Sequence, residues 1–148
     1  LSDNEIAKGL SSYEPSNNRS EVKKKGSNTF ILDAYNANPS SMEVAINNLM
    51  GTDGANHSVI LGEMLEVGAT SADEHRAICQ RLQVLKLKTA CLVGKEFTQF
   101  KDNFEFNFFD NVDELIEWLK SHQLSNETVL IKGSRGNKLE KAAEFLLA

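Results

Sequence analysis

Three short strings of polar residues carry the side-chain types that bind nucleotides and carboxylates. The first is Asp33-Ala34-Tyr35-Asn36-Ala37-Asn38-Pro39-Ser40-Ser41-Met42. Its carboxylate can accept hydrogen bonds from the hydroxyls of a ribose, and its tyrosine can pack on a flat base. Asn38-Pro39-Ser40 by itself is better explained as a loop followed by a helix cap, with Asp33 in a local turn. Only the complete string therefore points to a ligand.

The second string is Leu61-Gly62-Glu63-Met64-Leu65-Glu66-Val67-Gly68, in which glycines flank two acidic residues. The alternative is a solvated loop, with Thr70 or Ser71 capping the next helix and Glu74 completing a capping box. His75 follows in the first turns of that helix. A lone helical histidine is more often a surface or partly packed residue than a catalytic one.

The third string is Lys132-Gly133-Ser134-Arg135-Gly136-Asn137-Lys138, a glycine- and serine-containing turn with three cations. Backbone N–H groups at the start of a following helix, together with Lys132 and Arg135, can hold a carboxylate or a phosphate. The alternative is a basic surface loop. The spacing of a Walker phosphate loop is absent from this string and from the rest of the chain.

Alternating strands and helices are predicted to position these strings. We expect strands at residues 30–32, 58–61, 89–93, 104–109 and 128–131, and helices at residues 41–50, 71–85, 112–122 and 138–147. Several strands are continuous apolar runs, which is typical of strands covered on both faces. The pattern predicts an α/β fold: an open, doubly wound, mainly parallel sheet with helices on both faces. Each string directly follows a strand and so falls at the ligand-binding edge of such a sheet.

The residues before this α/β pattern form a separate short piece. Ser2 or Asp3 can cap a short helix, and residues 19–24 and 29–33 are extended candidates joined by a hairpin turn at residues 25–28. We place a domain boundary there, with residues 1–27 as the tail of a preceding domain and residues 28–148 as the main domain. The chain opens without an initiator methionine and looks like part of something longer.

Composition and absent motifs exclude several classes of protein. A formal charge of −5 and a pI near 5.2 argue against nucleic-acid binding. Cys79 and Cys91 lack the spacing of a zinc site and are predicted to be buried and reduced, as in a cytoplasmic protein. No apolar run is long enough for a membrane span. Neither a dinucleotide-binding glycine motif nor a nucleophile elbow is present. The strings therefore look like substrate-binding elements without catalytic residues or a metal site of their own.

The three strings, in the same order, resemble the C-terminal part of the Mur ligases, and within that family the branch that adds D-alanyl-D-alanine. The segment around Arg19 looks like the end of the family's central ATP-binding domain, so the tail of residues 1–27 is assigned to that domain. The resemblance implies a bacterial cytoplasmic enzyme of three domains that uses ATP and Mg²⁺. Such an enzyme would join D-alanyl-D-alanine to UDP-N-acetylmuramoyl-tripeptide, a step of peptidoglycan precursor synthesis.

The resemblance also implies roles for individual residues. Arg19, Asp33, Tyr35 and Asn36 would contact the nucleotide. The residues expected on the side of the incoming dipeptide are Asn38, Lys132, Gly133, Ser134 and Arg135, with Glu63 and His75 as further candidates. Glu63 departs from the aspartate expected at its position. Because the UDP-sugar, phosphate and magnesium sites would belong to the other domains, we expect this chain to be inactive alone and to bind no cofactor tightly.

Two alternatives stay open at this point. One is a related ligase that adds a different amino acid, or glutamate to folate, although the tyrosine–asparagine–alanine–asparagine sequence argues against it. The other is a non-catalytic binding module of flavodoxin or receiver type. Such a module needs a phosphate loop or an acidic cluster after its first strand, and Asp33 alone does not provide one.

Overall fold

A computed structural model describes residues 21–33, 37–54, 56–65 and 67–148, with only the backbone of Arg135. The predicted N-terminal helix, Arg19, Tyr35 and Asn36 lie outside the described residues. The core of the described part is a six-stranded sheet in the order β2-β3-β7-β4-β5-β6. The strands are β2 (Glu21–Lys25), β3 (Asn28–Asp33), β4 (His57–Gly62), β5 (Leu87–Val93), β6 (Asn107–Phe109) and β7 (Thr128–Lys132).

The sheet is mainly parallel, as the sequence predicted. All neighbouring strands are parallel except β2, which pairs antiparallel with β3 at the edge. The hairpin between them turns at Gly26, whose φ of 60° is a conformation that glycine adopts at little cost. This pairing places residues 21–25 in the same sheet as β3. The division of the chain at residues 27 and 28 stays a prediction.

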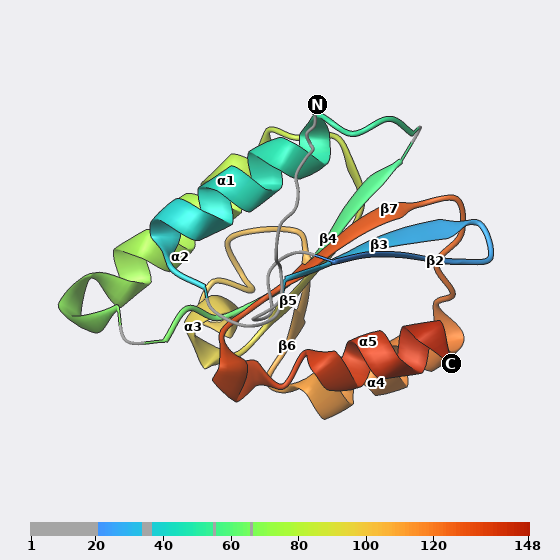
Figure 1. The fold of residues 1–148 in the computed structure, drawn as a ribbon. Coiled ribbons are helices and arrows are strands. Elements are labelled where there is room, and N and C mark those ends of the chain that lie inside the picture. The colour runs from blue at the N-terminus through green and yellow to red at the C-terminus, as the bar shows by residue number, and fades with distance from the viewer. Residues whose placement is uncertain (1–20, 34–36, 55, 66) are drawn as a thin grey trace.

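Helices cover both faces of the sheet (Figure 1). The helices are α1 (Pro39–Met50), α2 (Ser71–Gln83), α3 (Lys95–Thr98), α4 (Val112–Ser121) and α5 (Glu140–Leu147), with 3-10 turns η1 (Gly68–Thr70) and η2 (Arg135–Asn137). Helices α1 and α2 lie on one face, whereas α4 and α5 lie on the other (Figure 1). This is the doubly wound architecture expected from the alternation of strands and helices.

Two apolar cores, one on each side of the sheet, hold the layers together. Along β4, Val59 and Leu61 belong to the core under α1 and α2, whereas Ile60 belongs to the core under α4 and α5. The alternation follows from the two-residue period of a strand. Because both faces are covered, the apolar runs that predicted β4 and β7 are continuous rather than alternating.

Most element boundaries lie within two residues of the predictions, and three differences have a structural cause or concern a missed element. Strand β6 begins at Asn107 rather than at Phe104, because Phe104 and Phe106 pack as stacked rings beside the sheet instead of joining it. Helix α5 begins at Glu140 rather than at residue 138, because Lys138 has a φ of 56°. The short helix α3, which follows Gly94, was not predicted.

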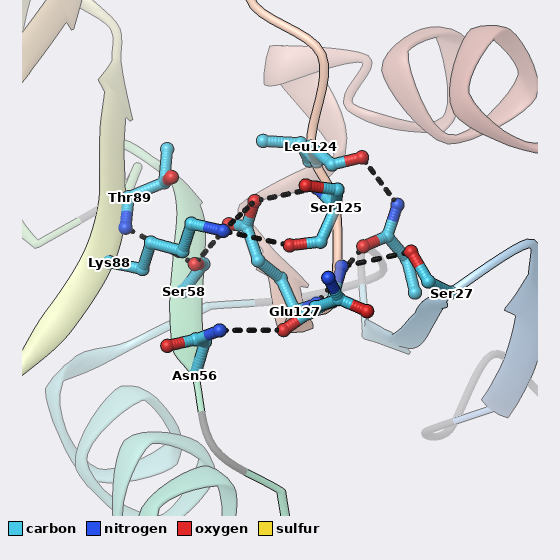
Figure 2. Close-up of polar contacts among 10 residues, drawn as sticks. Ser27, Asn56, Ser58, Lys88, Thr89, Leu124, Ser125 and Glu127 are labelled. Carbon is cyan, nitrogen blue, oxygen red and sulfur yellow. Dashed lines mark hydrogen bonds and ion pairs between the residues drawn. The ribbon is translucent and has the colours of Figure 1, made fainter.

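The amino-terminal edge of the sheet is held by a buried carboxylate (Figure 2). Glu127, only 3% exposed, accepts hydrogen bonds from Ser58 Oγ and from the Ser125 N–H. The ammonium of Lys88 lies 3.9 Å from the same carboxylate and donates to the Ser125 carbonyl at 2.8 Å. These contacts tie β4 and β5 to the segment that enters β7, at the edge opposite the three polar strings.

Among the described residues, no helix combines the length and the apolar composition that a bilayer crossing would require.

Candidate ligand site at the carboxyl edge of the sheet

The three polar strings come together because β7 lies between β3 and β4. Strands β3 and β4 lead into α1 and α2 on one face of the sheet, whereas β7 leads into α5 on the other (Figure 1). Connections that leave neighbouring strands toward opposite faces open a crevice at their carboxyl ends, which is where ligands bind in open α/β sheets. The candidate site is this edge.

Asp33 and Lys132 form an ion pair across the crevice. They end β3 and β7 and are direct partners in the register of the two strands. The Lys132 ammonium lies 2.8 Å from Asp33 Oδ2, and the side chains of Lys132 and Asp33 are 3% and 20% exposed, respectively. Each charge offsets the cost of burying the other. The sequence assigned these residues to two different ligands, whereas the structure joins them.

The loop after β7 is folded back on itself and tied to the loop after β4. Asn137 Oδ1 accepts a hydrogen bond from the Ser134 N–H at 2.9 Å. Ser134 Oγ lies 2.9 Å from the Glu63 carbonyl and 3.1 Å from Asn137 Oδ1, and its single hydrogen can serve one acceptor at a time. Gly62 has no room for a side chain, because an added Cβ would lie 2.2 Å from Asn137 Oδ1. The second and third strings therefore form one packed unit.

His75 contacts this unit from the interior of the protein and does not line the crevice. Its ring is completely buried in α2. His75 Nε2 accepts the Met64 N–H at 2.8 Å, and Nδ1 lies 2.8 Å from the Ser71 carbonyl. The sequence suggested His75 as a further candidate for lining the cleft, but its ring is fully engaged inside the protein. The capping of α2 by Thr70 with Glu74 is not found either, because Thr70 makes no side-chain cap.

The carboxylate of Glu63 lies across Gly94, the residue that follows β5. Glu63 Oε1 accepts the backbone N–H of Glu96 at 3.0 Å, at the start of α3. Gly94 has a φ of 114°, and a Cβ there would lie 2.5 Å from the Glu63 carboxyl carbon. Both the backbone conformation and the close approach require glycine. The sequence prediction missed this contact, although Gly94 directly follows a predicted strand.

A cavity of about 490 Å³ opens beside Asp33, between β3 and α1. Its walls combine apolar and polar side chains: Ile31, Val44, Ala45 and Leu130 with Asp33, Asn38, Ser40, Ser41 and Asn48. Asn38 is also the N-cap of α1, where its Oδ1 accepts the Ser41 N–H at 2.9 Å. The helix-cap interpretation of Asn38 is therefore confirmed, and the same residue lines the cavity.

A second cavity, of about 310 Å³, lies at the carboxyl ends of β4, β5 and β6 and is lined by both acidic and basic side chains. It is lined by Glu63, Val93, Asp110, Asn111, Val112, Asp113, Gly136, Asn137, Lys138 and Lys141. Asn111 caps α4 by accepting the Glu114 N–H at 3.0 Å. A cavity that contains both carboxylates and ammonium groups suits a zwitterion. The sequence analysis did not single out Asp110 or Asn111, although they follow a predicted strand.

Metal and thiol chemistry find no support in the described part of the chain. Within the described residues, no group of three or more His, Cys, Asp or Glu side chains could hold a metal ion. Cys79 and Cys91 are free and buried, as the sequence predicted. Burial raises the pKa of both thiols to about 12, which keeps them protonated and unreactive at neutral pH.

The fold and the edge define an α/β domain that binds small ligands at the carboxyl ends of its strands. The sequence model of the family described as "Mur ligase, glutamate ligase domain" matches residues 18–135. The chain therefore belongs to the Mur ligase family, and the interpretation as a flavodoxin- or receiver-type module is set aside.

Several known proteins similar to this chain are named as ligases that add D-alanyl-D-alanine. UDP-N-acetylmuramoyl-tripeptide–D-alanyl-D-alanine ligase of Rickettsia prowazekii is 35% identical over 120 residues, which are 78% of this chain and 26% of the relative. A crystal structure of MurF from Acinetobacter baumannii is 30% identical with a TM-score of 0.79, over 99% of this chain and 33% of that one. MurF of Thermotoga maritima in complex with ADP, at 24% identity, has the same fold, with a TM-score of 0.75 over 91% of this chain and 31% of that one. The chain thus spans about a quarter to a third of the length of these proteins.

Proposed function

We propose that this chain is the C-terminal part of a ligase that joins D-alanyl-D-alanine to UDP-N-acetylmuramoyl-tripeptide at the expense of ATP. The family match and the names of the relatives support the reaction. The observation that carries the proposal is the shared edge, where Asp33, Glu63, Lys132 and Ser134 meet between two cavities of different character. One edge that offers two unlike subsites suits a reaction with two small substrates.

The nucleotide is assigned to the cavity beside Asp33. Its apolar wall, with Ile31 and Val44, suits a flat base, and the Asp33 carboxylate can accept hydrogen bonds from ribose hydroxyls. The complex of T. maritima MurF with ADP supports nucleotide binding in this family. Arg19, Tyr35 and Asn36 keep their proposed roles beside the nucleotide.

The dipeptide is assigned to the mixed-charge cavity. Lys138 can pair with its carboxylate, and so can Lys141, whose exposed ammonium lies 3.6 Å from Asp113. The carboxylates of Glu63 and Asp110 can hold its ammonium group. Arg135, which precedes the lining residue Gly136 in the chain, is proposed as a further partner of the carboxylate. Lys132 is less suited to that role than the sequence suggested, because its ammonium is buried and paired with Asp33.

The chemistry of such a reaction depends on parts outside this chain. When bound, ATP and Mg²⁺ supply the phosphoryl group and the positive charge that activate a carboxylate. The residues of this chain bind and orient two substrates, and catalysis of this type depends largely on positioning. We therefore propose that the UDP-sugar, phosphate and magnesium sites lie on the other domains of a cytoplasmic enzyme, and that residues 1–27 belong to the domain before this one.

Kinetics of the full-length enzyme test these assignments. Asp33→Asn keeps the size of the side chain but removes the charge, and we expect a KM for ATP about tenfold higher with little change for the dipeptide. Arg135→Ala and Lys138→Ala should show the opposite pattern. Lys24→Ala, on the exposed edge strand β2, is the control. Unchanged KM values in all three site variants would overturn the site assignment.

A substrate panel tests the reaction itself. The proposed enzyme should form product with D-alanyl-D-alanine and not with single amino acids or with folate and glutamate. A clear preference for a single amino acid would favour the related ligase activity instead.

A further inference from the structure

We propose that His75 is a positioning residue that holds the dipeptide side of the ligand edge through a single peptide group, the one between Glu63 and Met64. This inference rests on the proposed function. The N–H of that peptide group donates to His75 Nε2 at 2.8 Å, and its carbonyl accepts from Ser134 Oγ at 2.9 Å. One rigid, planar group thus connects α2 to the loop after β7.

The hydrogen bonds of His75 determine its tautomer. Nδ1 lies 2.8 Å from the Ser71 carbonyl oxygen, which can only accept, so Nδ1 carries the ring proton. Nε2 faces the Met64 N–H, which can only donate, so Nε2 is unprotonated. The ring is completely buried and its neighbour Phe97 meets it edge to face, with centroids 4.7 Å apart. Water therefore has no access to take over the role of Nε2.

Removing the Nε2 acceptor of His75 should displace the dipeptide side of the ligand edge and leave the nucleotide side in place. Met64 is 1% exposed, so without His75 its N–H would be a buried donor with no partner, and the peptide would rotate to reach one. Rotation would turn the Glu63 carbonyl away from Ser134 Oγ. Ser134 is bonded to Asn137, which lines the mixed-charge cavity. The Asp33 carboxylate is held by Lys132 instead and does not depend on this peptide.

Two substitutions of His75 separate the effect of its hydrogen-bond acceptor from the effect of side-chain packing. His75→Gln places an amide oxygen near the position of Nε2, which can accept the Met64 N–H. His75→Met has a similar length but offers no strong acceptor. If His75 works through this hydrogen bond, the glutamine variant should behave like the parent protein and the methionine variant should not.

Amide hydrogen exchange and ¹⁵N spectra of the 148-residue chain test the contact directly. We expect His75 to be neutral with the proton on Nδ1, and the Met64 amide to exchange about tenfold faster or more in His75→Met than in the parent chain or in His75→Gln. The Leu130 amide in the middle of β7 serves as a control for global unfolding. A proton on Nε2, or equal exchange of Met64 in all three proteins, would overturn the proposal.

Kinetics of the full-length enzyme test the consequence. His75→Met should raise the KM for D-alanyl-D-alanine about tenfold, with kcat and the KM for ATP within about twofold, and His75→Gln should restore the KM. A glutamine variant as impaired as the methionine variant, or a parallel rise of both KM values, would contradict a positioning role. An enzyme without any dipeptide ligation would refute the proposed function, while the exchange of the Met64 amide would still decide the role of His75.

Discussion

Asp33 and Lys132 are separated by 99 positions in the chain, yet they end neighbouring strands and pair at 2.8 Å. The sequence identified both as ligand-binding candidates from the strings around them. It could not show that they bind each other, because strand order is decided by the packing of the whole sheet. Removing either charge breaks this largely buried ion pair. Asparagine also removes the charge of Asp33, but it keeps a side-chain oxygen that can accept a hydrogen bond from the Lys132 ammonium, and alanine does not.

The two cysteines allow a prediction about pH. Burial raises the pKa of Cys79 and Cys91 from 9.0 to about 12, and the nearby Glu127 carboxylate adds to the effect at Cys91. Because the pKa is higher in the folded state, the stabilising contribution is complete below pH 9.0 and is lost as the pH rises toward 12. We expect stability to urea to fall over this range, and alkylation of the native thiols to be slow at neutral pH.

The double substitution Cys79→Ala and Cys91→Ala is the matched control for this prediction. Its stability should fall less steeply above pH 9.0 than that of the parent chain, because the thiols no longer titrate. Equal slopes in the two proteins, or rapid alkylation before unfolding, would contradict the burial of these thiols.

The elements that the sequence predicted well are those with strong apolar patterns. Strands β4 and β7 are continuous apolar runs, and α4 carries apolar residues three or four apart. The elements that it missed are short and depend on tertiary contacts. Helix α3 spans only Lys95–Thr98, which is too short for a helical period to show in a sequence. Strand β6 is shorter than its aromatic run because the first phenylalanines pack beside the sheet.

At the scale of elements, Gly94 is the position where β5, α3 and the loop after β4 depend on one another. Gly94→Ala would force a side chain onto a residue with φ of 114° and push it against the Glu63 carboxylate. We expect a loss of about 1–3 kcal/mol in the free energy of unfolding, the usual scale of backbone strain. Urea unfolding of the 148-residue chain measures this loss of stability.

Gly51→Ala provides the comparison. Gly51 is the C-cap of α1 with a φ of −88°, and the atom nearest to a Cβ added there would be 3.6 Å away. Its stability should stay within about 0.5 kcal/mol of the parent, as for ordinary surface substitutions. Equal unfolding midpoints for the two variants would show that the contact between Gly94 and Glu63 does not constrain the fold.

At the scale of the whole molecule, the chain spans 33% of the A. baumannii MurF structure that it matches. A ligand site shared between domains is incomplete on one of them, and an incomplete site offers little preorganisation. We expect the 148-residue chain to release no phosphate from ATP, and to bind ADP at least about ten times more weakly than the full-length enzyme. Isothermal titration and a phosphate-release assay measure both. ATP turnover by this chain alone would contradict the division of the site.

The sequence by itself determined the fold class, the family and the three strings that build the ligand edge, because local patterns and ordered motifs are written in neighbouring residues. It did not determine which strand lies beside which, and therefore neither the pairing of Asp33 with Lys132 nor the second cavity at Asp110 and Asn111. The burial of His75 beneath the loop after β4 was likewise decided by tertiary packing. A hydrogen bond between distant residues forms only when the sheet brings their strands together, and no local pattern encodes that order.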